Sequence, residues 1–358
     1  MSDSDKENGV QYFEGVEKLL EVWFKKSDGV TKVCDLRNIP RQKWEGLLKI
    51  VRCEIISFVR NDHVDAYVLS ESSMFVAHRR FILKTCGNTT PLLCLKPLLL
   101  LVEQYAGYDE VEDVFYSRKN FKRPDLQLAP HHSFEEEVAL LDTFFNDGAA
   151  YCLGTINRDC WYLYTLNRIH NNQNALCCGL PKSIEEGLNE PDQTLEILMS
   201  DLDQHVMNVF TKEYSSTAAE ATQKSGIDKL MPNMVIDDFL FEPCGYSMNG
   251  ISKNDGPDLA SGCYMTIHIT PEPEFSYVSF ESNVPQSSYK EVISRVLETF
   301  QPGKFVLTVF ANKTSIAAGT PRELESTVSF GPWMRHEIQY CRFKNYDLTY
   351  AFYSKFPS

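Results

Sequence analysis

The stretch Leu69-Ser70-Glu71-Ser72-Ser73-Met74-Phe75-Val76 places four polar residues between apolar runs. Similar runs, rich in β-branched and aromatic residues, continue on both sides, and this composition favours strands over helices. The runs cover residues 55–59, 66–69, 74–76 and 81–83. The stretch therefore predicts a turn between two strands of an antiparallel sheet, with the peptide bond between Glu71 and Ser72 inside the turn.

A serine in a tight turn can break the peptide bond that precedes it. The Ser72 hydroxyl can attack the carbonyl carbon of Glu71 and convert the amide into an ester. Removal of the Ser72 α-proton then drives β-elimination, and hydrolysis of the resulting dehydroalanine leaves a pyruvoyl group at a new amino terminus. The alternative is an ordinary polar turn, which is what most such tetrapeptides are. The stretch alone does not separate these interpretations.

Further blocks favour the first interpretation because all of them match one family. They are Phe13-Glu14-Gly15, Lys84-Thr85-Cys86, the decapeptide FEPCGYSMNG at 241–250 and the decapeptide TIHITPEPEF at 266–275. With these blocks the chain resembles the eukaryotic S-adenosylmethionine decarboxylases over nearly its whole length. Members of that family cut themselves and carry a covalent pyruvoyl group.

The resemblance implies cleavage between Glu71 and Ser72 into a β chain, 1–71, and an α chain, 72–358, whose first residue becomes the pyruvoyl cofactor. The cofactor forms a Schiff base with S-adenosylmethionine and accepts the electrons released with CO2. The product is the aminopropyl donor for spermidine and spermine synthesis. The alternative function is that of a catalytically inactive paralogue, an allosteric partner of an active decarboxylase. The joint presence of five residues argues against it: Glu71, Ser72, Cys86, Ser247 and His268.

The family resemblance makes Cys86 the proton donor to the substrate carbon that has lost CO2. A thiol suits this role because its ordinary pKa lies about 1 to 2 units above neutral. Cysteines are more often small buried hydrophobic residues. The spacing of Cys86 from Ser72 matches the family, and we therefore prefer the catalytic role.

The same resemblance makes His268 the base that removes the Ser72 α-proton, with Ser247 supporting self-processing. His268 alternates with Thr266 on one face of a predicted strand, so that its side chain is expected to enter a polar interface. Two acidic residues near the amino terminus, Glu14 and Glu17, also match the catalytic motif, and we expect Glu14 to help hold the active site.

Phe13 and Phe241 resemble the two family phenylalanines that sandwich adenine and face the positive sulfur with their π-systems. Glu272 matches the carboxylate that accepts both ribose hydroxyls, and backbone groups of Glu71 are expected to contact the substrate. Aromatic residues in strands belong more often to a core, which stays the alternative for both rings. Glu242 stands where relatives often have asparagine.

A second group of residues matches the family positions that bind putrescine. The group comprises Glu21, Lys84, Phe115, Asp192, Thr194, Glu196, Glu281, Phe310 and Tyr346. Carboxylates gathered in a partly buried place raise one another's pKa values unless a cation joins them, and a linear diamine would serve. Plant-like members carry basic residues instead, whereas Leu19 here is not basic. We therefore expect putrescine to act as an activator; the alternative is a set of unrelated solvated charges.

Composition excludes several other classes of protein. The 358 residues contain 35 Lys and Arg against 49 Asp and Glu, a net charge of −14, which disfavours nucleic acid and anionic membranes as partners and favours cationic ligands. Eleven cysteines without a Cys-x-x-Cys motif indicate no disulfide framework and no metal site, as in a reduced cytoplasmic protein. Residues 1–9 are polar, which predicts disorder and no signal peptide. The longest apolar run, 91–102, is too short to span a bilayer.

Hydrophobic periodicity predicts helices and strands along the rest of the chain. Helices are expected at 15–24, 92–104, 133–148, from 192 onward and at 287–300, strands at 150–166, 264–269, 276–282 and 304–311, and polar linkers at 167–190 and 211–226. This order predicts an α+β protein of antiparallel sheets with helices on one face of each.

The family resemblance makes the architecture more definite. It implies one four-layer α-β-β-α sandwich over 10–358, built from two similar halves at about 10–190 and 191–358, with helices outside two large stacked sheets. It also implies a homodimer of αβ units.

Overall fold

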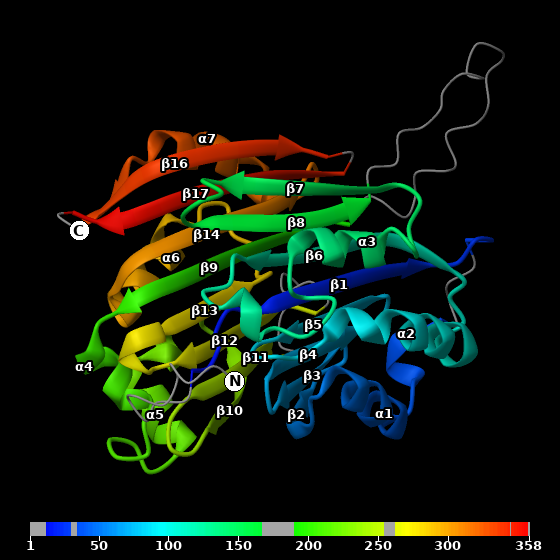
Figure 1. Ribbon diagram of the computed structural model, residues 1–358, viewed down its shortest axis with the longest axis horizontal. Coiled ribbons are helices and arrows are strands. Elements are labelled where there is room, and N and C mark those ends of the chain that lie inside the picture. Colours follow the sequence, from blue (N-terminus) through cyan, green and yellow to red (C-terminus); the bar gives the residue numbers. More distant parts are fainter. Residues whose placement is uncertain (1–11, 30–33, 167–189, 254–261, 344, 357–358) are drawn as a thin grey trace.

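The computed structural model describes residues 12–29, 34–166, 190–253, 262–343 and 345–356. Two large antiparallel sheets dominate it, and their strands cross the molecule in a similar direction (Figure 1). The first sheet contains β1 (Lys18–Lys25), β2 (Ile55–Arg60), β3 (Val64–Leu69), β4 (Ser72–Ala77), β5 (Arg80–Thr85), β6 (Glu110–Lys119), β7 (Gly148–Gly154) and β8 (Cys160–Leu166). Its order is β2-β3-β4-β5-β1-β6-β8-β7.

The second sheet is formed by the other half of the chain. It contains β9 (Gln193–Leu202), β10 (Met234–Leu240), β11 (Tyr246–Ser252), β12 (Tyr264–Thr270), β13 (Tyr277–Ser282), β14 (Pro302–Asn312), β15 (Ser329–Phe330), β16 (Trp333–Arg342) and β17 (Tyr346–Lys355). Its order is β10-β11-β12-β13-β9-β14-β17-β16-β15. In each sheet the first strand of that half, β1 or β9, lies in the interior and not at an edge.

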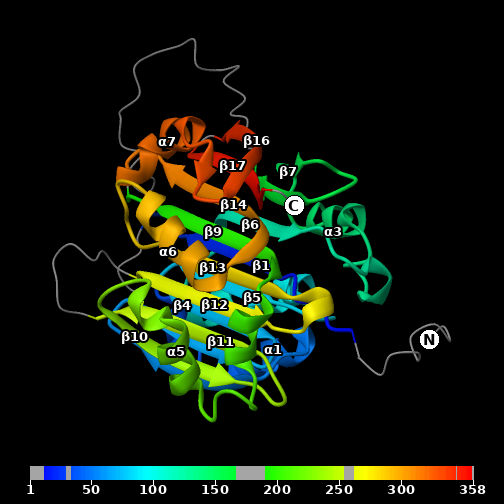
Figure 2. The ribbon, with the colours of Figure 1, turned by 90° about the vertical axis from the view of Figure 1, so that its left-hand side faces the viewer.

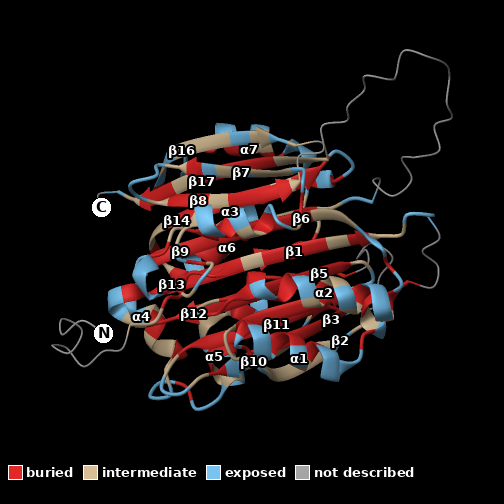
Figure 3. Cartoon of the chain, turned by 45° about the vertical axis from the view of Figure 1, so that its right-hand side comes forward, coloured by how far each residue is buried: buried red, intermediate tan, exposed pale blue. Residues whose placement is uncertain are grey.

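Helices cover the outer face of each sheet. The first sheet carries α1 (Arg41–Val51), α2 (Leu95–Leu101) and α3 (Phe134–Leu141); the second carries α4 (Gln204–Met207), α5 (Ala218–Ser225), α6 (Lys290–Phe300) and α7 (Thr320–Ser326). Figure 2 shows α5, α6 and α7 in front of the second sheet and α3 on the opposite side of the molecule. Buried residues follow the strands, whereas exposed residues gather on the helices and loops (Figure 3). The expected four-layer sandwich is therefore confirmed.

The layer between the two sheets is partly polar. Along β12, Met265, Ile267 and Ile269 join the core under the outer helices. Thr266 and His268 face the first sheet, as the alternation of a strand requires. Apolar clusters also lie between the sheets, one of them around Phe75 and Tyr264, whose rings are 4.4 Å apart. The polar part of this layer holds the candidate site.

Two predicted helices are wrong. The segment predicted as a helix at 15–24 contains most of β1, which begins at Lys18, and the segment after 192 forms β9. Both strands lie between two other strands and are buried on both faces, so their apolar residues do not alternate with polar ones and imitate a helical pattern. Residues four apart share a face in a strand as they do in a helix, and so Glu17 and Glu21 still point to the same side.

Other predictions differ in detail. The linker predicted at 211–226 contains α5, and α1 was not predicted. The helix predicted at 133–148 ends at Leu141, but its capping residue is confirmed, because the Ser133 hydroxyl accepts a hydrogen bond from the Glu136 amide at 3.2 Å. The strands predicted around Glu71 and in the second half are present. Residues 1–9 and nearly all of the loop 167–190 lie outside the described residues.

Candidate active site

The peptide bond between Glu71 and Ser72 lies in the tight turn that joins β3 to β4. Leu69 pairs with Ser72, so that only Ser70 and Glu71 form the loop. Ser72 is buried and has a φ of +143°, a backbone conformation that is costly for any residue with a side chain. The turn therefore holds the serine in a strained conformation beside the carbonyl that it would attack.

Both partners of that attack have hydrogen bonds that suit it. The carbonyl oxygen of Glu71 accepts from the Cys86 amide at 2.9 Å and from the Cys86 thiol at 3.3 Å. Two donors on a carbonyl oxygen stabilise the negative charge that grows there during nucleophilic attack. The Ser72 hydroxyl donates to Glu17 Oε1 at 2.6 Å. Glu17 is therefore placed to receive the proton of the attacking hydroxyl.

Glu17 is ionised in this environment. Burial alone would raise its pKa, but the ammonium group of Lys84, 3.5 Å from Glu17 Oε2, and the hydrogen bond from the Ser72 hydroxyl bring the pKa below its ordinary value. Lys84 is itself completely buried. An ionised carboxylate is an acceptor only, which agrees with the direction of the bond from Ser72.

His268 is held by hydroxyl groups on both ring nitrogens. Its Nδ1 lies 2.9 Å from Ser247 Oγ, and its Nε2 lies 2.9 Å from Thr266 Oγ1 and 3.0 Å from Ser73 Oγ. Burial lowers the pKa of His268 to about 4, so the ring is neutral at physiological pH and able to accept a proton. Ser247, which was expected to support self-processing, lies beside the ring, and the ring also contacts Ser73 next to the cleavage bond.

Sequence reasoning missed three polar residues of this network. Ser73 donates to Asn249 Oδ1 at 2.6 Å and also contacts Thr266, so these side chains join the cleavage turn to β11 and β12. Ser73 and Asn249 both lie inside the matching blocks. No local pattern distinguishes them, because Ser73 follows another serine and the contacts join strands that are far apart in the chain.

Cys86 follows β5 and lies beside Glu71. Burial, with the nearby Glu71 and Glu17 carboxyl groups, raises the pKa of its thiol well above the ordinary value, so the thiol is protonated. The next residue, Gly87, has a φ of +61° and its amide donates to the Glu14 carbonyl at 2.8 Å. A Cβ at this glycine would lie 3.1 Å from the ring of Phe13. The turn therefore needs glycine for its backbone and for its close contact with Phe13.

Glu14 organises the segment that follows β6. Its carboxylate accepts from the Tyr12 hydroxyl at 2.7 Å and from the backbone amides of Lys122 and Arg123 at 3.0 and 3.2 Å. The bonds from Lys122 and Arg123 attach this distant segment to the residues just before β1. The contacts support a role for Glu14 in holding the site in shape.

The expected substrate residues occupy half-buried positions. Phe13 lies next to Gly87, and Phe241 lies at the end of β10 with its ring 4.9 Å from that of Phe239. One carboxylate oxygen of Glu272 is buried, with no hydrogen-bond partner among the described residues. Such an oxygen is costly unless a ligand donates to it. Glu242 is exposed.

A buried charge cluster lies beside the cleavage turn. Lys84 Nζ lies 2.8 Å from Glu281 Oε2 and 3.4 Å from Glu196 Oε1, in addition to its contact with Glu17. Burial, opposed by Lys84 and reinforced by Glu281, raises the pKa of Glu196 to about 7. One lysine therefore faces three carboxyl groups in a place without solvent.

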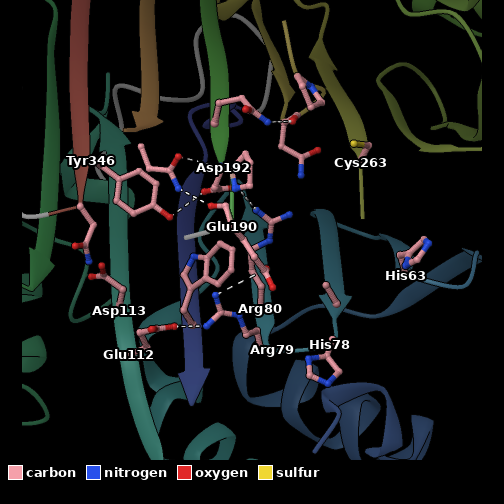
Figure 4. A pocket seen from close by; sticks show the side chains of 18 of the residues that line it. His63, His78, Arg79, Arg80, Glu112, Asp113, Glu190, Asp192, Cys263 and Tyr346 are labelled. Atoms are coloured by element: carbon pink, nitrogen blue, oxygen red, sulfur yellow. Dashed lines mark hydrogen bonds and ion pairs between the residues drawn. The ribbon is translucent and has the colours of Figure 1, made fainter. Parts of the chain in front are cut away.

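The remaining expected diamine residues lie further along the same layer. Arg80 Nη1 lies 3.3 Å from Asp192 Oδ1, and the Tyr346 hydroxyl donates to Asp192 Oδ2 at 3.0 Å; Figure 4 shows the three side chains pointing toward one another. Trp23 donates to Glu21, whose pKa burial raises to about 8. These groups border a cavity of about 690 Å³ that includes Trp23, Arg80, Asp192 and Tyr346 in its lining.

The other members of the expected diamine set line the same layer. The ring of Phe115 meets those of Phe310 and Tyr346 edge-on, at 5.6 and 5.5 Å. Thr194 pairs with Phe310 across β9 and β14. Arg80 was missed from sequence, because the family resemblance did not single it out.

Comparisons with known proteins give the chain its family. A profile described as Adenosylmethionine decarboxylase matches residues 10–354. The chain belongs to the adenosylmethionine decarboxylase family. A Drosophila melanogaster S-adenosylmethionine decarboxylase proenzyme is 54% identical over 349 residues, which cover 97% of this chain and 97% of that protein. A Xenopus laevis proenzyme is 48% identical and covers 98% and 97%.

A solved structure supports the same family. The crystal structure of a Trypanosoma brucei AdoMetDC-delta26 monomer aligns with a TM-score of 0.56 and 26% identity, and covers 79% of this chain and 98% of that chain. The resemblance to the adenosylmethionine decarboxylases stated from sequence is thus confirmed. Among the described residues, no helix is long and apolar enough to cross a bilayer, and no three His, Cys, Asp or Glu side chains gather as metal ligands would.

Proposed function

We propose that this protein is a self-processing S-adenosylmethionine decarboxylase, which cuts itself between Glu71 and Ser72 into chains 1–71 and 72–358. The observation that carries the cleavage step is the strained Ser72, whose hydroxyl is hydrogen-bonded to the ionised Glu17. Family membership supports the activity.

The side chains suit each step of the cleavage. Ser72 Oγ attacks the Glu71 carbonyl carbon while Glu17 takes the hydroxyl proton, and the Cys86 amide and thiol stabilise the oxyanion. Collapse breaks the C–N bond, Glu17 returns the proton to the departing Ser72 nitrogen, and the two parts of the chain stay joined by an ester. The neutral His268, which Ser247 positions and which contacts Ser73 beside the cleavage bond, accepts the Ser72 α-proton, and elimination releases the Glu71 carboxylate. Water then adds to the dehydroalanine at residue 72, ammonia leaves, and a pyruvoyl group remains.

A pyruvoyl group at residue 72 would supply a ketone that binds the substrate amine and draws off the electrons released with CO2. Cys86 then gives its proton to the substrate carbon. We assign adenine stacking to Phe13 and Phe241 and the ribose hydroxyls to Glu272, whose buried oxygen needs donors. Phe13 lies next to the turn of Cys86 and Gly87, which supports a substrate position near the thiol.

We assign the acidic layer to putrescine. It holds five carboxyl groups and two fixed cations among the described residues: Glu17, Glu21, Asp192, Glu196 and Glu281 against Lys84 and Arg80. Burial raises the pKa values of Glu21 and Glu196, and the neighbouring carboxyl groups Asp192 and Glu281 add to the rise. A doubly charged diamine would correct the excess of negative charge, and the aromatic rings of Phe115, Phe310 and Tyr346 suit its methylene chain.

We further propose that the processed protein is a cytoplasmic homodimer of αβ units. Support comes from membership of the family. Sedimentation of the purified protein tests the dimer.

The test of the main proposal is the intact mass of the purified protein. We expect two fragments, the larger with a pyruvoyl amino terminus, and a single uncut chain for Ser72→Ala. An uncut wild-type chain would instead favour an inactive allosteric paralogue. A larger fragment that begins with serine would show cleavage without cofactor formation.

A further inference from the structure

Lys18 is a completely buried cation at the start of β1. None of the ion pairs among the described residues involves it. Its Nζ instead donates to the Gly87 carbonyl at 2.8 Å and to Gln127 Oε1 at 2.9 Å, and lies 5.2 Å from the centre of the Phe121 ring. Burying an ammonium group without a carboxylate partner is costly, so its presence here calls for a role.

The contacts place this ammonium group at the candidate proton donor. Lys18 pairs with Thr85 across β1 and β5, and Thr85 directly precedes Cys86. The carbonyl that Lys18 holds belongs to Gly87, on the other side of Cys86. The backbone of the Cys86 turn is therefore attached to the sheet on one side and to a buried charge on the other.

The charge of Lys18 also acts on the thiol. Burial lowers the pKa of Lys18 to about 8, with Cys86, Glu137 and Glu14 opposing this and Arg118 adding to it. Lys18 in turn offsets part of the rise that burial causes in the pKa values of Cys86 and Glu71. A nearby positive charge stabilises the thiolate form of a cysteine more than the thiol form.

We propose that Lys18 is a positioning residue for the proton transfer: its ammonium group holds the turn at Cys86 and Gly87 and faces the thiolate that forms when Cys86 gives up its proton. The inference rests on the role proposed for Cys86. In that step the S–H bond of Cys86 breaks and a C–H bond forms at the substrate carbon that has lost CO2. The thiolate then takes a proton from water.

A misplaced or less acidic thiol has a measurable chemical consequence. If the proton is added to the carbon derived from Ser72, alanine becomes the first residue of the larger fragment and the enzyme is inactive. Edman degradation detects this alanine, whereas a pyruvoyl amino terminus blocks the degradation. The ratio of turnovers to alanine formed reports on proton delivery, and general loss of stability does not change it.

The experiment compares Lys18→Met with Lys49→Met. The first change keeps the length of the side chain and removes its charge and both hydrogen bonds. The second makes the same change on an exposed side chain of α1, away from the candidate site. We expect Lys18→Met to self-cleave, to lose kcat by about tenfold or more with a smaller change in KM, and to form more alanine per turnover. Lys49→Met should match wild type, and Lys18→Arg should recover part of the turnover ratio.

Gln127→Leu gives a second route if Lys18→Met does not fold, because it removes one partner of Nζ and leaves the charge in place. An intermediate rise in alanine supports the proposal. Wild-type kcat and turnover ratio in Lys18→Met, or in Gln127→Leu when that variant stands in for it, would overturn it. Failure of the underlying function looks different: wild-type protein would stay uncut, or Cys86→Ala would keep full activity.

Discussion

Ser72 has a strained backbone conformation and a hydroxyl group that can attack the preceding peptide bond. A φ of +143° costs a residue with a side chain roughly 1–3 kcal/mol, and cleavage of the bond before it releases that strain. Serinolysis requires a serine in the predicted turn, which points to Ser72 and the bond that precedes it, whereas the roles of Cys86 and His268 came from the family resemblance. Ser73 and Lys18 could not be predicted in the same way, since their roles depend on contacts between distant strands.

At Cys86, replacement by alanine separates processing from turnover. The Cys86 amide that holds the Glu71 carbonyl remains in Cys86→Ala, so the chain should still cut itself. Decarboxylation should fall by about 10²- to 10⁴-fold, the usual contribution of a general acid. Single-turnover release of CO2 measures this, with Cys152→Ala as a control at an exposed cysteine. Near-normal turnover would refute the assignment.

At His268, replacement by alanine should stop maturation after the ester has formed. Ser72 and Glu17 keep their hydrogen bond in His268→Ala, so the first step remains possible, but the α-proton has no base. Hydroxylamine should then release two fragments from chains that otherwise stay joined by the ester. Cutting at the normal rate without hydroxylamine would show that another group takes the proton.

Among the elements, β1 and β9 show where sequence reasoning fails and why the site still emerged. Both are interior strands with apolar residues on either face, and periodicity cannot separate such strands from helices. In or next to these strands, Glu17 and Glu21, and likewise Asp192 and Glu196, are nevertheless four residues apart, and this spacing places the members of each pair on one face in a strand or a helix. The site was therefore easier to predict than the elements that carry it.

The turn after β5 gives a prediction at the same scale. In Gly87→Ala the positive φ costs about 1–2 kcal/mol, and the new methyl group meets the ring of Phe13. Gly29→Ala is a matched control, because Gly29 also has a positive φ, +71°, but no atoms within 4 Å of the added carbon. Chemical denaturation should show a loss of stability in both variants, whereas KM for S-adenosylmethionine should rise only in Gly87→Ala. If KM for S-adenosylmethionine were the same in Gly87→Ala and Gly29→Ala, Phe13 would have no role in substrate binding.

For the whole molecule, the acidic layer should make diamine binding depend on pH. Glu21 and Glu196 have pKa values raised to about 8 and 7, so each carboxyl group is protonated at low pH. Each must lose this proton before it can form an ion pair with an ammonium group of the diamine. A carboxyl group with a raised pKa favours the folded state while protonated, and this stability is lost as pH rises through the folded pKa.

The melting temperature without putrescine should accordingly fall as pH rises from about 6 to about 8, and the increase caused by putrescine should grow over the same range. Differential scanning fluorimetry measures both. Glu21→Gln should weaken the pH dependence, because its amide does not titrate. A putrescine effect that shrinks as pH rises would contradict the assignment.

The order of strands in the first sheet determines how the two fragments of a cleaved protein are held together. The cut would leave β1, β2 and β3 on the small fragment, yet β1 lies between β5 and β6 of the large one. The two pieces are interlaced, and the small one cannot depart without opening the middle of a sheet. Cleavage should therefore make unfolding irreversible. The uncut Ser72→Ala variant should refold after dilution from denaturant. The cut enzyme should not, because its two fragments must first meet again by diffusion.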